Sequence, residues 1–281
     1  MDKRSKNIET KIRDFAKNHY ENFPVSSFLI PKDYRKDIAI VYWFARTADD
    51  LADEGAISDA QRLNELSGFE RSFNESFSGD TSNPYLIILK NVIHSRNIDR
   101  QLFIDLISAF KQDVLKKRYA NRDEILDYCS RSANPVGRIL LRIFNINDKN
   151  AIICSDKICT ALQLANFYQD TIIDLKKNRI YYPADEMEMF KVTEKMFELR
   201  ENNPNIKALV KHNVDKAKLL FNEGKDLLNY LSGRIKMEIK WTIMGGEMIL
   251  NKIEKCDYEV LNCRPVLNKL DFLKLLVKSI F

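Results

Sequence analysis

The chain has 281 residues, 45% of them hydrophobic and 30% charged, and its 45 basic and 40 acidic side chains give a formal net charge of +5. It is long enough to bury a large core, and its 8 glycines and 7 prolines are too few for a protein of many short strands and tight turns. The basic excess is a small difference between large numbers mixed along the chain, so it does not indicate nucleic-acid binding.

The cysteines and the apolar runs bear on the cellular compartment. The five cysteines are odd in number, include no C-x-x-C pair and accompany only three scattered histidines, which disfavours zinc and favours free thiols in a reducing compartment. No signal peptide is recognised at the N-terminus, and the longest apolar run, 38–45, is far shorter than the ~20 residues that span a bilayer. We expect a cytoplasmic protein, with membrane contact limited to the lipid surface.

Taken in order, the chain reads as a series of helices. They are expected over about residues 5–20, 31–55, 58–78, 84–95, 99–117, 122–145, 148–176, 204–231 and 234–255. A bend at 22–24 follows the first helix, and an extended segment at 179–183 precedes a short helix near Met187. Pro135 predicts a kink inside its helix. No linker or repeat interrupts the series, so residues 1–281 are expected to form a single all-α domain.

Two acidic clusters, 49–54 and 166–174, each follow an apolar helix, and the segment 38–45 is apolar on every face, as in a core helix. Side chains four residues apart share a helix face. This spacing predicts one row of Asp49 and Asp53 and a second row of Asn166, Asp170 and Asp174. Buried carboxylates need counter-charge, and Mg²⁺ would supply it while also binding phosphates. One row alone fits the solvated end of a core helix equally well, but two matching rows favour a metal site.

Facing acid rows in a helical cavity suit one chemical task, which is to bind an allylic diphosphate through Mg²⁺ and stabilise its departure. The carbocation that remains requires apolar and aromatic walls that exclude water. Aromatic residues beside the motifs could line such a cavity, although each fits ordinary core packing as well: Phe23, Tyr42, Trp43, Phe44, Tyr128 and Phe167.

The segments 42–53 (YWFARTADDLAD) and 163–174 (QLANFYQDTIID) resemble the two aspartate-rich motifs of the squalene and phytoene synthase family. The resemblance covers essentially the whole chain and implies an isoprenoid-synthase fold, an all-α bundle around a central cavity. It also implies an enzyme with Mg²⁺ as cofactor and a prenyl diphosphate as substrate. The implied metal ligands are Asp49, Asp50, Asp53, Asn166, Asp170 and Asp174. Of these, the implied catalytic residues are Asp49, Asp53, Asp170 and Asp174. The implied substrate-binding residues are His19, Asn22, Phe23, Tyr42, Arg46, Tyr128, Gln163, Tyr181 and Arg264.

The stretches 19–25, 44–55, 128–138 and 166–170 are similar to the bacterial hydroxysqualene synthase branch of this family. That branch removes diphosphate from presqualene diphosphate, rearranges the cyclopropylcarbinyl cation and lets water capture it as hydroxysqualene. The resemblance thus implies a role in squalene and hopanoid biosynthesis. A separate presqualene-diphosphate synthase and a squalene-forming flavoenzyme would be its pathway neighbours.

Two departures from the wider family concern the number of diphosphates bound. The chain has Tyr20-Glu21-Asn22-Phe23 where relatives commonly have Ser-x-Ser-Phe, and Gln169 where they commonly have Arg. Both changes favour one bound diphosphate over two. Three alternatives remain open: condensation of two farnesyl diphosphates to presqualene diphosphate, squalene or dehydrosqualene, a class I terpene cyclase, and a non-catalytic assembly factor on the same fold. An assembly factor would not need both acid motifs.

Overall fold

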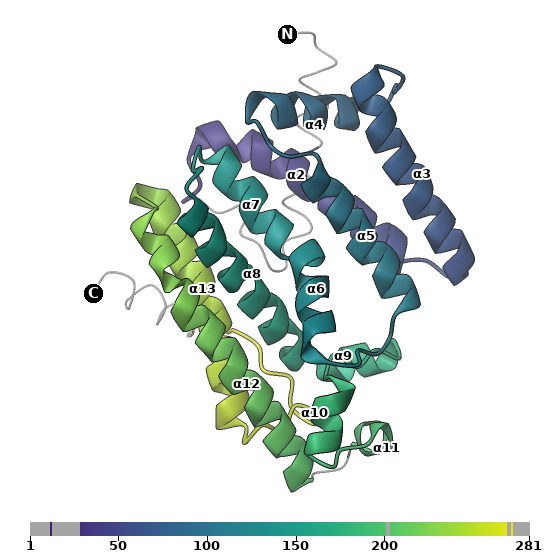
Figure 1. The fold of residues 1–281 in the computed structure, drawn as a ribbon, viewed down its shortest axis with the longest axis vertical. Coiled ribbons are helices and arrows are strands. Elements are labelled where there is room, and N and C mark those ends of the chain that lie inside the picture. Colours follow the sequence, from purple (N-terminus) through teal and green to yellow (C-terminus); the bar gives the residue numbers. More distant parts are fainter. Residues whose placement is uncertain (1–11, 13–28, 201–202, 269–270, 272–281) are drawn as a thin grey trace.

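Every regular element in the described part of the chain is a helix (Figure 1). The computed structural model describes residues 12, 29–200, 203–268 and 271, so the expected helix 5–20 and the bend at 22–24 fall outside the described residues. The helices are α2 (Lys32–Asp53), α3 (Asp59–Ser78), α4 (Pro84–Ser95), α5 (Gln101–Leu115), α6 (Arg122–Ser132), α7 (Asn134–Ile143), α8 (Lys149–Gln169), α9 (Thr171–Lys176), α10 (Ala184–Met189), α11 (Glu194–Glu198), α12 (Pro204–Gly224), the 3-10 helix η1 (Lys225–Asn229) and α13 (Gly233–Lys255).

The helix starts follow from local sequence. Ser58 and Gln61 form a capping box at α3, in which Ser58 Oγ accepts from the Gln61 amide at 3.3 Å and Gln61 Oε1 accepts from the Ser58 amide at 3.0 Å. Asn83 caps α4, which then begins with a proline, and Pro31 precedes α2 as expected. The predicted starts of these helices are therefore confirmed.

The expected helix 122–145 is two helices. α6 ends at Ser132 and α7 begins at Asn134, so the kink predicted at Pro135 is a complete break. Gly137 brings α7 directly against α8, because a Cβ at this position would lie 2.4 Å from Ser155 Oγ. Gly137, in the first turn after the break, therefore allows close packing of α7 on α8.

The expected helix 148–176 is also divided, at Asp170, between α8 and α9. The hydroxyl of Thr171 donates to the carbonyls of Phe167 and Tyr168, both at 3.1 Å. It thus competes with backbone amides for the carbonyl acceptors in the last turn of α8. Nevertheless, the Asp170 amide donates to Asn166 O and the Asp174 amide donates to Asp170 O, as in a continuous helix. The second acid row thus keeps its four-residue register across the break.

The core consists of two clusters of buried side chains. The first cluster centres on α8, α12 and α13, and the second on α2, α3, α4 and α5. Helices α5 and α7 contribute to both, with Ala109 and Leu141 in the first cluster and Leu106 and Ile139 in the second. One acid row belongs to each half, since α2 packs in the second cluster and α8 in the first.

None of the described helices combines the length and the apolar character that crossing a lipid bilayer requires. All five cysteines are free thiols, as their number and spacing predicted.

The expected helix 204–231 ends earlier as an α-helix, because the chain tightens into the 3-10 helix η1 after Gly224. A Cβ added at Gly224 would lie 2.7 Å from the Ile158 side chain of α8.

Candidate active site

Asp53, the last residue of α2, is held by two cations that follow α9. Arg179 Nη2 lies 2.6 Å from Asp53 Oδ1, and Lys177 Nζ lies 2.6 Å from Asp53 Oδ2. Burial alone would raise the pKa of Asp53, but the hydrogen bonds from Arg179 and Lys177 outweigh it and lower the pKa to about 2. The same two positive charges act on the carboxyl of Asp174. One acid from each row, Asp53 and Asp174, is therefore influenced by the same pair of cations.

Arg46 lies close to the other carboxylates at the end of α2 and just after it. Its Nε lies 2.7 Å from Asp50 Oδ1, its Nη1 lies 3.4 Å from Asp49 Oδ2, and its Nη2 lies 3.0 Å from Glu54 Oε1. Burial and the negative charge of Asp53 raise the pKa of Asp49 to about 6, although Arg46 opposes the shift. Asp49 thus has the character of a carboxylate that lacks full counter-charge.

The second row is contacted by the segment that follows α13. Arg264 Nε lies 2.6 Å from Asp170 Oδ1, and the Gln169 side-chain amide donates to Pro265 O at 2.7 Å. Burial and the nearby charge of Asp170 raise the pKa of Asp174 to about 7. Arg264 and Asp170, both expected at the site, are therefore brought together, while Gln169 is engaged with the backbone of the C-terminal segment.

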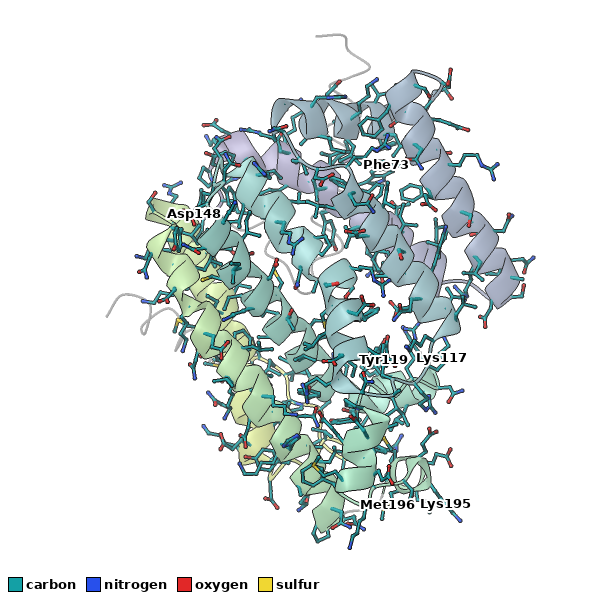
Figure 2. The ribbon with its side chains drawn as sticks, viewed as in Figure 1. Phe73, Lys117, Tyr119, Asp148, Lys195 and Met196 are labelled. Carbon is teal, nitrogen blue, oxygen red and sulfur yellow. The ribbon has the colours of Figure 1, made fainter. Side chains whose placement is uncertain are left out.

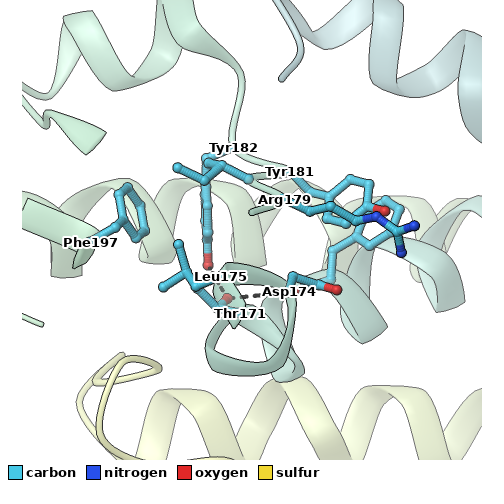
Figure 3. A pocket seen from close by; sticks show the side chains of 9 residues that line it. Thr171, Asp174, Leu175, Arg179, Tyr181, Tyr182 and Phe197 are labelled. Carbon is cyan, nitrogen blue, oxygen red and sulfur yellow. Dashed lines mark hydrogen bonds between the residues drawn. The ribbon is translucent and has the colours of Figure 1, made fainter. Parts of the chain in front are cut away.

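A small pocket, partly open to solvent, adjoins the second row. The polar ends of Asp174 and Arg179 point to the same side of it, Phe197 lies on the other side, and the hydroxyls of Thr171 and Tyr182 are 3.1 Å apart (Figure 3). The residues that line it are Phe167, Thr171, Asp174, Leu175, Arg179, Ile180, Tyr181, Tyr182 and Phe197.

Aromatic rings gather beside the acid rows. Phe167 and Tyr181 stack with centroids 3.6 Å apart and planes 6° from parallel, and Tyr128 packs against both at 6.0 and 6.3 Å. Tyr119 extends the group, with its centroid 5.7 Å from that of Tyr181. These rings form a buried cluster that includes Tyr128 and Phe167, for which the sequence left both a cavity wall and ordinary core packing open.

Asp113 of α5 is a buried acid in this group that sequence reasoning missed. Its Oδ2 accepts a hydrogen bond from Tyr128 Oη at 2.7 Å, and its Oδ1 accepts one from Tyr181 Oη at 3.3 Å. Burial raises the pKa of Asp113 to about 6, against the lowering effects of the Arg179 charge and the Tyr128 hydrogen bond. The available signal was a single acid on the buried face of an amphipathic helix, a position where ionisable residues are rare unless paired.

The segment after α5 is tied to the segment that carries Arg179 and Tyr181. The Ile180 amide donates to Lys117 O at 3.1 Å, and the Ala184 amide donates to Tyr119 O at 2.9 Å. Lys117 and Tyr119 accordingly lie together near α9 and α10 (Figure 2). Backbone pairing between distant parts of the chain thus fixes the tyrosines against Asp113.

Three further expected site residues are half-buried: Tyr42 on α2, which packs against the second cluster, and Gln163 and Asn166 on α8. Three others, His19, Asn22 and Phe23, lie outside the described residues. Besides Asp113, the structure adds Lys177 and Arg179 to the expected set, because both bind Asp53.

The chemistry of the two rows fits magnesium. Within the described residues, no three acidic, histidine or cysteine side chains converge closely enough to enclose a metal ion by themselves. Mg²⁺ is usually held by only one or two carboxylates together with phosphate oxygens and water. Burial and, second to it, neighbouring carboxylates raise the pKa values of Asp49 and Asp174, and such a cation would offset both effects.

Comparison with known proteins shows consistent similarity. A profile of the squalene/phytoene synthase family matches residues 16–271. Hydroxysqualene synthase of Zymomonas mobilis is 41% identical over 172 residues, which cover 60% of this chain and 56% of that protein, a little more than half its length. Hydroxysqualene synthase of Rhodopseudomonas palustris is 30% identical over 250 residues, covering 88% and 84%. The crystal structure of squalene synthase HpnC from Alicyclobacillus acidocaldarius is 34% identical with a TM-score of 0.85 over 92% of this chain and 97% of that chain.

Proposed function

The chain belongs to the squalene/phytoene synthase family, whose members process prenyl diphosphates, and on that premise we propose that it is a hydroxysqualene synthase. It would ionise presqualene diphosphate with Mg²⁺, and water would capture the rearranged cation to give hydroxysqualene and diphosphate. The observation that carries the proposal is the meeting of Asp53 with Lys177 and Arg179 beside Asp174, next to an aromatic wall. The relatives from Zymomonas and Rhodopseudomonas, both named hydroxysqualene synthases, support the choice of reaction.

The acidic and the basic residues of the site would have different roles. The oxygen atoms of Asp49, Asp53, Asn166, Asp170 and Asp174 would hold Mg²⁺. When bound, the metal would neutralise charge that develops on the departing diphosphate. Arg46, Lys177, Arg179 and Arg264 already contact these carboxylates, so their guanidinium and ammonium groups stand within reach of phosphate oxygens.

The aromatic wall would protect what remains after diphosphate leaves. Phe167 and Tyr181 line the pocket beside Asp174, and Tyr128 backs them. Their rings exclude bulk water and offer π faces to a carbocation. Since the pocket is small, it would border the reacting end of the substrate rather than enclose it, and the hydrocarbon tails would lie elsewhere along the helices.

The nearest alternative is condensation of two farnesyl diphosphates, which the similarity to a squalene synthase structure keeps open. The absence of Arg at position 169 argues for a single diphosphate, because Gln169 donates to Pro265 O instead of presenting positive charge. A non-catalytic assembly role is disfavoured by the complete pair of acid rows.

We further propose that residues 1–281 form one domain, since α5 and α7 contribute to both core clusters.

Substrate assays separate these functions. Purified protein would be incubated with Mg²⁺ and either presqualene diphosphate or farnesyl diphosphate, and the products identified by mass spectrometry. Hydroxysqualene from presqualene diphosphate is the expected result. Turnover of farnesyl diphosphate alone, without turnover of presqualene diphosphate, would establish the condensing activity in its place.

A further inference from the structure

Asp113 has a hydrogen-bonding arrangement that the proposed ionisation step leaves unexplained. It is 8% exposed, and each of its carboxylate oxygens receives one tyrosine hydroxyl, from Tyr128 at 2.7 Å and Tyr181 at 3.3 Å. Its backbone carbonyl accepts from Lys117 Nζ at 2.6 Å and from Arg179 Nη2 at 3.1 Å. The residue is therefore fixed through both its backbone and its side chain.

The ionised carboxylate fixes the direction in which each of the two tyrosine hydroxyls points its hydrogen. A carboxylate can only accept hydrogen bonds, and a tyrosine hydroxyl has a single hydrogen to donate. Burial and the Asp113 charge raise the pKa of both Tyr128 and Tyr181, so the two phenols keep their hydrogens. With both hydrogens directed at Asp113, the remaining lone pairs of the two oxygens face away from it.

One of the two tyrosines lines the candidate active site, and the other packs against its aromatic wall. Tyr181 lines the pocket together with Asp174 and Arg179 and stacks on Phe167 at 3.6 Å. Tyr128 packs against the same two rings. Asp113 therefore fixes the hydroxyl of one residue of the pocket wall and the hydroxyl of the ring packed behind it.

We propose that Asp113 is a positioning residue that locks the Tyr128 and Tyr181 hydroxyls as hydrogen-bond acceptors, so that they hold the water that captures the cation. The inference rests on the proposed function and adds the control of its last step. In that step a water oxygen forms the new C–O bond, one water O–H bond breaks, and the proton passes to the diphosphate released earlier. A water that donates one hydrogen to a tyrosine oxygen keeps a lone pair for the carbon.

Asp113→Asn tests the proposal with almost no change in shape. The new amide can donate to a tyrosine oxygen, so a hydroxyl is free to turn its hydrogen toward the substrate. Each reaction with presqualene diphosphate and Mg²⁺ would be assayed for released diphosphate and for the ratio of alcohol to hydrocarbon products. We expect that ratio to fall about tenfold, as the loss of a hydrogen bond to a charged group implies, with a smaller change in diphosphate release.

Matched variants make the result decisive. Asp113→Glu keeps an acceptor carboxylate and should recover part of the alcohol, while Glu194→Gln, in an exposed ion pair with Arg118, should match the wild type. If Asp113→Asn fails to fold, Tyr128→Phe and Tyr181→Phe take its place, and an unchanged product ratio in both overturns the inference. A folded Asp113→Asn protein with the wild-type ratio overturns it as well. Wild-type protein that forms no alcohol at all refutes the proposed function instead, so the two failures are distinct.

Discussion

The Arg179 guanidinium binds the Asp53 carboxylate at two points, with Nη2 2.6 Å from Oδ1 and Nη1 3.2 Å from Oδ2. The contact joins residues 126 positions apart and fastens the end of α2 to the segment that follows α9. Arg179 is buried, and its ion pair with Asp53 raises its own pKa. The ion pair therefore links two distant segments of the chain and places a positive charge beside the acid rows.

Arg179→Gln should lower the free energy of unfolding by about 1.5–3 kcal/mol near neutral pH, since it removes hydrogen bonds between charged groups. The lowered pKa of Asp53 makes this contribution present above the unfolded-state pKa near 3.8 and lost as pH falls through about 2. The difference from wild type in urea unfolding should thus shrink in acid. Lys211→Gln, in an exposed i,i+4 pair with Asp215, is the control and should cost no more than ~0.5 kcal/mol.

Asp49→Asn and Asp170→Asn should each reduce diphosphate release by about 100-fold or more, because each removes a carboxylate proposed to hold Mg²⁺. Release would be measured with a colorimetric diphosphate assay at saturating substrate, and Glu194→Gln would serve as the folded control. Turnover at the wild-type rate in both variants would refute the role of the acid rows.

Mg²⁺ together with inorganic diphosphate should raise the melting temperature of the protein. A ligand at about 100 times its dissociation constant stabilises the folded state by ~2.7 kcal/mol, which corresponds to roughly 5 °C or more for a chain of this size. Differential scanning fluorimetry would record the shift in wild type and in Asp170→Asn, where it should be smaller. Equal shifts in the two proteins would place the binding elsewhere.

Asp174→Asn should gain stability relative to wild type as pH rises from about 5 to about 8. Burial and Asp170 raise the pKa of Asp174 to about 7, above its unfolded value of 3.8. The folded protein therefore binds more protons between these values, and stability from Asp174 is present at low pH and lost as pH rises through 7. Thermal melts without metal would test this, and parallel pH curves for the two proteins would contradict it.

Gly246→Ala should destabilise the protein by about 1–3 kcal/mol through overpacking between α13, α12 and α8. A Cβ at this position would lie 2.5 Å from Phe221 Cζ and 2.8 Å from Leu162 Cδ2. Gly68→Ala on α3 is the matched control, because nothing lies within 4 Å of its Cβ position and alanine favours the helix by up to ~1 kcal/mol. Urea denaturation of both variants should give shifts of opposite sign.

The sequence predicted the helices and the four-residue register of the acid rows well because both depend on local spacing. The capping box at Ser58 and the apolar run before Asp49 are complete within a few residues, so no tertiary knowledge was needed. The resemblance of the aspartate-rich motifs to a known family identified the same fold as the comparison with solved structures.

The break at Asp170 and the role of Asp113 were less accessible. The break depends on the Thr171 hydroxyl, which binds carbonyls of the preceding helix α8 and also lies within hydrogen-bond distance of Tyr182, eleven residues away. Asp113 obtains its partners from residues 15 and 68 positions away. Neither contact leaves a periodic trace in the sequence, since each arises only when distant segments pack together.

The membership of α5 and α7 in both core clusters has a consequence for protein engineering. Substitutions deep inside α12 or α3 act on the packing of one cluster. Substitutions on the faces of α5 and α7 that join both clusters should also change the spacing between the two acid rows. A search for heat-tolerant variants that still turn over substrate should therefore begin with these two shared helices.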